Sequence, residues 1–279
     1  MAISYSPTEF TPTNTSLKPT VFWRIAEDIP PPLCRILMVL SVVLPLLLWT
    51  IISHLPGVNS SFLPTPEAVL GAMQHLGEQG FLSQDIAASC FRVFAGFLLS
   101  VIVSIPLGVS MGTFASIRAL FEPISALLRY MPAPAFIPLL IIYLGLDEEP
   151  KIALIFIGTV FFNTLMLMDA VKFVPKDLIE TTYTLGGSRS QVVTSVILPY
   201  IVPSIIDTFR INIATSWNLV VVAELLAAEV GLGKRILLAQ SFLNTDEIFA
   251  CLIVLGVIGF LIDLTFRQVL RWTCNWSFE

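Results

Sequence analysis

Long apolar runs without charged residues dominate the pattern of this chain. Residues 93–117, for example, contain no Asp, Glu, Lys or Arg. A run of this length can cross the hydrocarbon core of a bilayer, which takes about 20 helical residues. The pattern predicts an all-α, polytopic membrane helical bundle. About six transmembrane helices are expected, over residues 36–53, 91–115, 122–146, 152–171, 199–223 and 248–268.

The third of these runs is irregular. It contains Arg129 and three prolines between Met131 and Pro138. Proline removes a backbone donor and clashes with the preceding turn, so an uninterrupted helix is excluded. Broken backbone at membrane depth is stable only beside protein or water. We therefore expect a break within residues 122–146.

The N-terminal segment differs from the rest of the chain. It is rich in Ser, Thr and Pro up to Pro32 and has no basic region followed directly by an apolar core, so it does not resemble a cleaved signal peptide. We expect residues 1–35 to form a cytosolic tail and residues 36–279 to form the transmembrane domain. Between the first two spans, Thr65 and Pro66 predict the capped start of a short surface helix.

Composition supports a membrane location. Hydrophobic residues make up 56 % of the chain, charged residues 13 %, and the mean hydropathy is +0.85, whereas soluble domains carry about 25 % charged residues. The formal net charge is −5 and no basic run is present. Nucleic acid is therefore not expected as a partner, because nothing would neutralise its phosphates.

The loops differ in charge between the two sides of the predicted bundle. One side holds nine basic residues and the other three, so both termini are expected in the cytosol. The basic side comprises Lys18, Arg24, Arg35, Arg118, Lys172, Lys176, Arg189, Arg267 and Arg271, and the other side Lys151, Lys234 and Arg235. Acids including Asp147, Glu148, Glu149, Glu224 and Glu229 are expected in loops on the outer side, and the run Asp147–Glu149 is expected to be simply solvated.

The cysteines and histidines do not suggest a metal site. Cys34, Cys90, Cys251 and Cys274 lack paired spacing and are expected to be small buried hydrophobic residues. His54 and His75 are isolated and are expected in exposed loops. No metal ion, cofactor or catalytic residue is predicted in this chain.

Residues 174–191 contain more signals for the start and end of helices than a simple connector needs. Pro175 and Asp177 suit the start of a helix, and Gly186 with Gly187 suits its end through positive φ. Ser188 and Gln191 form a capping-box pattern that opens the next helix. The segment is therefore predicted to be a stiff cytosolic elbow, either an ordinary helical hairpin or a lever for a soluble motor.

The elbow carries a resemblance to a known family. Glu180-Thr181-Thr182, then Gly186, then Val196-Ile197-Leu198-Pro199 resemble the signature loop of permeases of binding-protein-dependent ABC importers: E-A-A, three residues, G, nine residues, I-x-L-P. Thr181, Thr182 and Val196 depart from the motif but keep the spacing and the small size. Similar segments extend through most of the chain and include 62–66, 129–134, 223–226 and 231–233. Together they are similar to the nitrate, sulfonate, taurine and bicarbonate branch, above all to cyanobacterial-type nitrate/nitrite permeases.

This resemblance implies a type I importer in the cell inner membrane. Its parts would be two permease copies, expected to be a homodimer, two cytosolic ATPase subunits that bind ATP and Mg, and a periplasmic or lipoprotein binding protein. Coupling to the ATPase would involve Glu180, Thr181, Thr182, Leu185, Gly186, Gly187 and Ser188. The chain itself would not hydrolyse ATP, since Gly231-Leu232-Gly233-Lys234 lacks the spacing of a phosphate loop and is expected to be a turn.

Polar residues within the spans are candidates for a translocation pathway, because charge at membrane depth usually faces a bundle interior or water. Arg92, Arg129 and Arg210 are such cations, although Arg92 and Arg129 could snorkel and Arg210 could pair with Asp207. For Trp217, aromatic packing is expected. The pathway candidates are Arg210, Asn163, Thr164, Asn212, Thr215, Asn218, Arg129 and Met131, with Ser216 in the same cluster.

Other transported anions and other sources of energy for transport are also compatible with the sequence. Nitrate or nitrite is the expected anion, and bicarbonate, cyanate or a sulfonate such as taurine would suit the same branch. An ATP-independent anion channel or an ion-coupled carrier would share the hydropathy pattern. A carrier typically has inverted repeats and carboxylates inside the membrane, but here no internal repeat is found and the acids are expected in loops.

Overall fold

The computed structural model describes residues 29–274 of the chain, and its regular elements in this range are all helical. The all-α prediction is therefore confirmed. The chain divides into two compact units, Met1–Pro56 and Gly57–Glu279. The predicted tail of residues 1–35 lies mostly outside the described range.

The first unit contains helix α1, Pro31–Ser53, with proline in its first turn and Pro45 inside it. Apolar side chains such as Ile36 and Val42 are exposed around it. A helix that is apolar on all sides is typical of a membrane span.

Three long helices form the centre of the second unit, namely α3 (Phe81–Thr113), α6 (Glu149–Lys172) and α9 (Leu198–Ala227). Their shared core includes Val93, Leu154 and Val220, all with almost no exposed surface. Gly96 lets α3 approach α6 closely, because a Cβ at this position would lie 2.7 Å from the carbonyl oxygen of Ile152. Close backbone approach at small residues is typical of membrane helix packing.

The remaining helices surround this centre. The Thr65 hydroxyl accepts a hydrogen bond of 3.3 Å from the Ala68 amide, so the predicted cap is confirmed. The surrounding elements are α2 (Pro66–Glu78), α4 (Ala115–Arg129), the 3₁₀ helix η2 (Ala133–Phe136), α5 (Ile137–Leu144), α7 (Lys176–Thr184), α8 (Arg189–Gln191), the π-helix η3 (Val192–Ile197), α10 (Leu232–Ser241) and α11 (Thr245–Thr273).

The predicted third span is broken, as its prolines require. Helix α4 ends at Arg129, and the segment Ala133–Leu144 continues at an angle of 89°. Among the described residues, five helices are long and apolar enough to cross a membrane, or six if this bent pair is one span. The helix that carries the predicted second span is longer than expected, since α3 already begins at Phe81.

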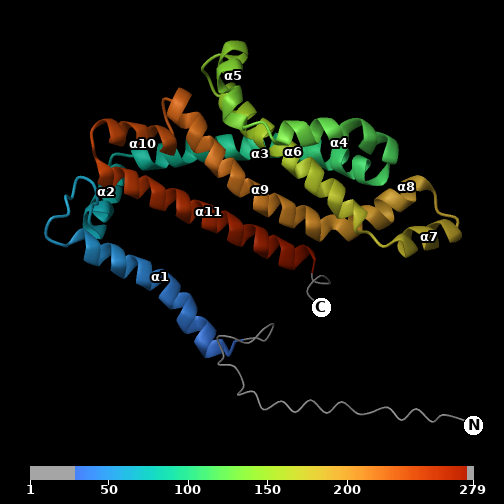
Figure 1. Ribbon diagram of the computed structural model, residues 1–279, viewed down its shortest axis with the longest axis horizontal. Coiled ribbons are helices and arrows are strands. Elements are labelled where there is room, and N and C mark those ends of the chain that lie inside the picture. The colour runs from blue at the N-terminus through green and yellow to red at the C-terminus, as the bar shows by residue number, and fades with distance from the viewer. Residues whose placement is uncertain (1–28, 275–279) are drawn as a thin grey trace, which may run out of the picture. The chain divides into compact units, whose positions relative to one another are not determined.

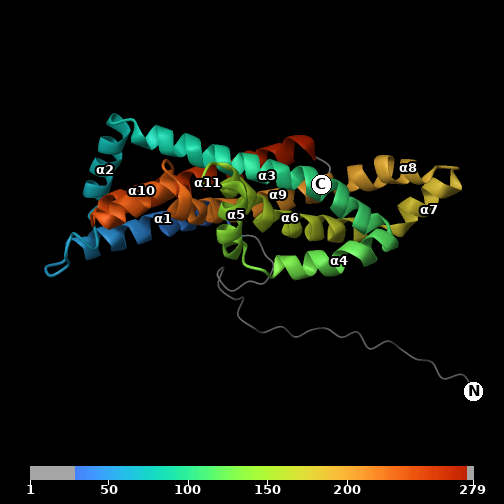
Figure 2. The same ribbon diagram turned by 90° about the horizontal axis from the view of Figure 1, so that it is seen from above.

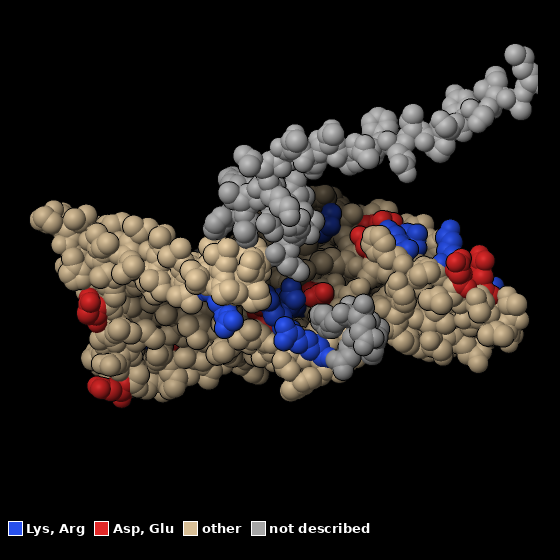
Figure 3. Space-filling model, turned by 90° about the horizontal axis from the view of Figure 1, so that it is seen from below, with Lys and Arg blue, Asp and Glu red and all other residues tan. Residues whose placement is uncertain are grey.

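The second unit has two ends that differ in the helices that form them. Helices α7 and α8 lie at one end, and α2 with α10 lies at the other, in both Figure 1 and Figure 2. The helices α3, α9 and α11 run between these ends, and α5 projects away from them in Figure 1. Charged side chains are few on the face in Figure 3, where most of the described surface is uncharged. Such a surface suits contact with lipid.

Candidate functional site

The elbow has the local structure that its sequence predicts. Helix α7 ends in a Schellman motif: the Gly187 amide donates to the Thr182 carbonyl (2.9 Å) and the Gly186 amide to the Tyr183 carbonyl (3.0 Å). Gly186 has φ +84°, whereas Gly187 does not have positive φ, so the prediction of positive φ at both glycines is right only for Gly186. The role of Gly187 is close packing, since a Cβ there would lie 2.7 Å from Thr182 Cγ2.

The second arm of the elbow begins with a complete capping box. The Ser188 amide donates to Gln191 Oε1 (2.7 Å), and the Gln191 amide donates to Ser188 Oγ (3.3 Å). The chain then forms the π-helix η3 before α9 starts at Leu198. Both arms of the elbow are thus fixed by hydrogen bonds, as a rigid lever requires.

The exposed face of α7 is more apolar than its sequence suggests. The hydroxyls of Thr181 and Thr182 donate to carbonyls one turn earlier, at 2.7 and 2.8 Å. Their donor hydrogens are therefore already used within the helix. Leu185 is 82 % exposed, and Tyr183 is also exposed. The side chains of Tyr183 and Leu185 together give the tip of this rigid hairpin an exposed apolar surface, and tyrosine is a residue type enriched at protein interfaces.

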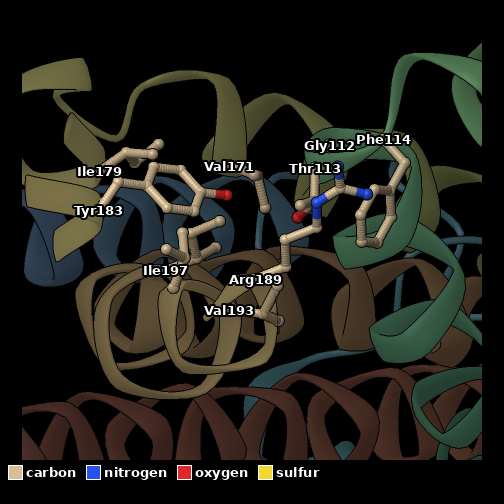
Figure 4. A pocket seen from close by; sticks show the side chains of 10 residues that line it. Gly112, Thr113, Phe114, Val171, Ile179, Tyr183, Arg189, Val193 and Ile197 are labelled. Carbon is tan, nitrogen blue, oxygen red and sulfur yellow. The ribbon is translucent and has the colours of Figure 1, made fainter. Parts of the chain in front are cut away.

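A cavity of about 270 Å³ separates the elbow from the ends of α3 and α6 (Figure 4). In Figure 4 the Tyr183 side chain extends into this space from α7, and Arg189 extends toward Thr113 and Phe114. The Thr113 hydroxyl is buried and has no hydrogen-bond partner in the described structure. Beside the cavity, Ile179 packs on the apolar cluster around Val171 and Ile197, which holds the elbow to the bundle.

Two of the pathway candidates meet inside the bundle. Asn163 Nδ2 donates to Ser100 Oγ (2.9 Å), and Asn212 Nδ2 donates to Asn163 Oδ1 (2.7 Å). All three side chains are buried, and they join α3, α6 and α9. Thr164 is also buried, and its hydroxyl donates to the Val160 carbonyl. These groups therefore hydrogen-bond within the chain.

The other pathway candidates are more accessible and lie apart from that cluster. Asn218 and Met131 are exposed, and Thr215 and Arg129 are half-buried. The Arg129 guanidinium lies 5.2 Å from the centre of the Tyr130 ring and 5.9 Å from that of Phe162.

Arg210 forms the ion pair with Asp207 that its spacing predicts. Their closest atoms are 3.1 Å apart, and Asp263 of α11 lies 3.3 Å from the same guanidinium. Asp263 also pairs with Arg267. All of these side chains are partly exposed, so this cluster is a solvated link between α9 and α11.

A buried charged cluster, which we call the α10 corner, lies at the end opposite the elbow. It comprises Asp85, Ser89 and Arg92 of α3, Glu224 of α9, and the three residues Gly231–Gly233 that open α10. The amides of Gly231, Leu232 and Gly233 donate to Asp85 Oδ1 (2.8 Å), Ser89 Oγ (3.0 Å) and Glu224 Oε2 (2.8 Å). Helix α10 has no local capping side chain, so two other helices supply its cap.

Within the α10 corner, Glu224 has no exposed surface and Arg92 is 2 % exposed. Glu224 Oε1 accepts from Ser89 Oγ (2.7 Å) and Arg92 Nη1 (2.6 Å). The expectation that Glu224 lies in an outer loop is wrong, because it lies within α9, where its hydrogen bonds offset the cost of burial. Arg92 does not snorkel to the surface either. Gly231-Leu232-Gly233 is more than a turn, since its amides bind side chains from α3 and α9.

Arg92 also reaches the loop before α6. Its Nε and Nη2 donate to the two carboxylate oxygens of Glu148, at 2.5 and 2.8 Å, and Lys151 Nζ donates to Glu148 Oε1 at 3.1 Å. The Arg92 hydrogen bonds lower the pKa of Glu148 to about 2. These groups line a cavity of about 470 Å³ together with residues such as Val230. The expectation that Glu148 is simply solvated is therefore wrong.

The isolated histidines and cysteines fit their expected structural roles in part. His54 and His75 are exposed, but His75 lies in α2 rather than in a loop. Cys251 and Cys274 are buried, whereas Cys34 and Cys90 are half-buried. Trp217 packs in the central core as expected, although its indole nitrogen has no hydrogen-bond partner there.

Comparison with known proteins identifies the family. The family described as the inner membrane component of binding-protein-dependent transport systems matches residues 104–273. The chain belongs to this family. The permease protein of the taurine transport system of Escherichia coli is 35 % identical over 239 residues, which cover 84 % of this chain and 87 % of that protein. The nitrate import permease protein of Synechocystis sp. is 31 % identical over 232 residues, 80 % of this chain and 83 % of that protein.

Solved structures support the fold of the permease. A structure titled as an inward-facing conformation of the MetNI methionine ABC transporter has a TM-score of 0.63 and 18 % identity, and covers 71 % of this chain and 98 % of that chain. The permease thus has the type I importer fold. It is not itself an enzyme, because in ABC transporters the ATPase activity lies in partner subunits. The family match includes the whole elbow and the α10 glycines, whereas Asp85, Ser89 and Arg92 precede it.

Two residues of the α10 corner, Asp85 and Ser89, are absent from the sequence-based predictions. Asp85, Ser89 and Arg92 are four and three residues apart, so they share one face of a helix. Polar residues with this spacing on an otherwise apolar helix are the available signal. The apolar pattern alone places the start of the second span at residue 91, which leaves Asp85 and Ser89 outside it and hides their proximity to Glu224.

Proposed function

We propose that this permease is the membrane-spanning subunit of an ATP-driven importer of a small oxyanion, either nitrate or a sulfonate. Cytosolic ATPase subunits drive it, and a periplasmic or lipoprotein binding protein delivers the anion. ATP and Mg bind to the ATPase partners.

The observation that carries this proposal is the elbow. Its Schellman motif and capping box make it rigid, and Leu185 is exposed at its tip. A rigid lever transmits displacement from a partner to the helices that follow it, whereas a flexible loop would absorb it. The elbow leads through η3 into α9, which packs on α3 and α6. Glu180, Thr181, Thr182, Leu185, Gly186, Gly187 and Ser188 form the surface for the ATPase subunit.

The same proposal sets the orientation in the inner membrane. The elbow end faces the cytosol, as do both termini, and the α10 corner is at the outer end. Basic residues around the elbow, including Lys172, Lys176 and Arg189, support this assignment through the positive-inside rule.

A second copy of the permease completes the pathway in this proposal. Asn163, Thr164 and Asn212 already have partners within the chain, so they position helices. Arg129, Met131, Thr215 and Asn218 retain accessible surface and are better placed to face an anion or the second copy. Arg210 is paired with Asp207 and Asp263 and links α9 to α11. Neutral donors suit a transported anion, because a strong cation would hold it too tightly.

Similar proteins include permeases for a sulfonate and for nitrate, so both anions are kept in the proposal. The taurine permease protein is 35 % identical to this chain and the nitrate permease protein 31 %. Nitrate and sulfonates share a charged group with three oxygen atoms, which the same neutral donors could bind. Bicarbonate and cyanate remain as alternatives for the test.

The experiment is uptake by proteoliposomes that contain the permease with its ATPase subunits and binding protein. Labelled nitrate and labelled taurine are offered separately, with nitrite, bicarbonate, cyanate and aliphatic sulfonates as competitors. We expect ATP-dependent uptake of one of the two anions and its loss in the variant Leu185→Asp. Uptake that persists without the ATPase subunits would contradict the proposal and favour a channel or an ion-coupled carrier. Competition by bicarbonate or cyanate alone would overturn the choice of anion.

A further inference from the structure

Four side chains at the α10 corner and the adjacent loop form a row of alternating charge. Glu224 pairs with Arg92 at 2.6 Å, Arg92 with Glu148 at 2.5 Å, and Glu148 with Lys151 at 3.1 Å. The order is negative, positive, negative, positive. The middle contact, between Arg92 and Glu148, joins α3 to the loop that connects α5 and α6.

The inner half of this row, the pair of Glu224 and Arg92, is held firmly in place. Glu224 has no exposed surface and binds Ser89, Arg92 and the Gly233 amide. Arg92 Nη1 also donates to the Val230 carbonyl at 2.7 Å. Gly231 leaves no free volume, since a Cβ there would lie 2.5 Å from Glu224 Cδ and 2.7 Å from Arg92 Nη1. The inner pair therefore cannot move without rearrangement of three helices.

In the outer half, Lys151 is buried at the start of α6, whereas Glu148 ends a loop that is less constrained. The Glu148 side chain is 45 % exposed and borders the cavity of about 470 Å³. It follows Gly145, whose φ of +85° ends α5. Helix α5 packs chiefly on α6 and η2 and leaves Ile142 and Tyr143 largely exposed. This loop can thus shift with fewer broken contacts than the α10 corner.

The order of the charges lets this row of ion pairs separate in the middle at a low cost in free energy. Separating Arg92 from Glu148 leaves Arg92 paired with Glu224 and Glu148 paired with Lys151, and each pair is neutral overall. An isolated buried charge would make such a separation very costly, but here neither half contains one. Water from the adjacent cavity can solvate the donors and acceptors that are released.

We propose that the contact between Arg92 and Glu148 is a releasable latch, which closes the outer end of the permease and opens once in each transport cycle. Arg92 and Glu148 are positioning residues in this scheme, and Glu224 and Lys151 neutralise them in the open state. The inference rests on the proposed ATP-driven function but not on the identity of the anion.

A reversible cross-link across the cavity tests the latch. Leu146→Cys and Val230→Cys introduce thiols on its two sides, because both residues line it and both are exposed. A short thiol-specific cross-linker is applied to the assembled transporter in nucleotide-free and in ATP-vanadate-trapped form. The wild-type chain, which keeps its four native cysteines, and each single variant are the controls.

We expect the yield of the cross-link to differ between the two states by at least about three-fold. We also expect the bridged protein to lose about ten-fold of its ATPase turnover, with recovery after cleavage by reductant. A merely structural contact would give equal yields and unchanged turnover, and either result would overturn the latch. Neither readout needs the anion, so a state-dependent cross-link without uptake of nitrate or taurine would refute only the proposed cargo.

A charge variant gives an independent test. Glu148→Gln weakens the middle contact while the Arg92–Glu224 pair remains, and Glu149→Gln is the matched control, because Glu149 is exposed and forms no ion pair in the described structure. In the assembled transporter with binding protein, we expect Glu148→Gln to raise ATPase turnover without substrate about three-fold and the control to leave it unchanged. Equal turnover in Glu148→Gln and wild type would contradict a latch that holds the outer end closed.

Discussion

Arg92 of α3 and Glu224 of α9 form an ion pair of 2.6 Å in which neither side chain has appreciable contact with solvent. Removing one partner leaves the other charge buried. We predict that Arg92→Met lowers the free energy of unfolding by about 3–5 kcal/mol, the range measured when one member of a buried pair is deleted. Chemical denaturation of the detergent-solubilised permease measures this change.

The matched control for that variant is Arg210→Met. Arg210 also pairs with an acid, Asp207, but both side chains are partly exposed. Exposed pairs contribute about 0–1 kcal/mol, so the control should differ little from wild type. Similar losses in the two variants would mean that burial of the Arg92 pair has no special energetic role.

The glycines that open α10 give a second prediction. A Cβ at Gly231 would overlap Glu224 and Arg92, and one at Gly233 would lie 2.7 Å from the Val221 carbonyl oxygen. We predict that Gly231→Ala and Gly233→Ala each destabilise the permease by about 1–3 kcal/mol through overpacking, to which backbone strain adds at Gly231 because its φ is +140°. Thermal unfolding of the purified variants measures the loss.

Gly259 provides the control, because a Cβ there meets nothing within 4 Å. It lies inside α11, where alanine is favoured over glycine by about 1 kcal/mol. Gly259→Ala should therefore be neutral or stabilising. If all three alanine variants behaved alike, close packing would not explain the two α10 glycines.

These predictions involve residues that the sequence reveals to very different extents. The elbow can be predicted in detail because its signals are local: Gly186 ends a helix and Ser188 with Gln191 starts the next. The break near Pro132 is likewise determined by the chemistry of proline. Local signals of this kind need no knowledge of the tertiary structure.

The α10 corner cannot be predicted in the same way. Glu224 and Ser89 are 135 residues apart in the chain, and a single sequence gives no information on such pairs. The pattern favours a loop position for Glu224, because an acid near the end of an apolar run usually marks the membrane boundary. Arg92 and Ser89 offset the cost of its burial, and neither lies near it in the sequence.

The tip of the elbow gives a third prediction. Leu185 is 82 % exposed and makes no large contribution to the core. We predict that Leu185→Asp leaves the thermal stability of the isolated permease unchanged but lowers co-purification of the ATPase subunits at least about ten-fold. Phe242→Asp is the control, since Phe242 is similarly exposed but lies at the other end, after α10. Normal ATPase binding by Leu185→Asp would contradict the assignment of the elbow as the docking surface.

Gly186 gives a fourth prediction, because its φ of +84° is unfavourable for other residues, although open space surrounds it. A β-branched residue there would cost about 1 kcal/mol or more through backbone strain alone. We predict that Gly186→Val reduces the coupling between ATP hydrolysis and uptake, whereas Gly186→Asn, which tolerates positive φ, keeps it. The ratio of anion transported to ATP hydrolysed measures coupling. An unchanged ratio in Gly186→Val would show that a rigid elbow is not needed.

The pKa of Glu148 gives the last prediction. Hydrogen bonds from Arg92, and to a lesser extent from Lys151, lower it from the ordinary value of 4.5 to about 2. A carboxyl group with a lowered pKa in the folded state stabilises that state fully above its unfolded pKa, and the stabilisation is lost as the pH falls through the folded pKa. The contribution of Glu148 should therefore be constant above about pH 5 and disappear between about pH 4.5 and 2.

The measurement compares the melting temperature of wild type with that of Glu148→Gln from pH 7 down to pH 2. We expect a constant difference above about pH 5 that shrinks as the pH falls toward 2, where about half of the wild-type carboxyl groups are protonated and most of their contribution is lost. Arg92, Lys151, Asp147, Glu224 and Glu229 are present in both proteins, so the comparison isolates the Glu148 carboxyl. A difference that kept its size at pH 2 would mean that the Glu148 side chain stabilises the loop by its shape and not by its charge, and the ion pair with Arg92 would then be too weak to act as a latch.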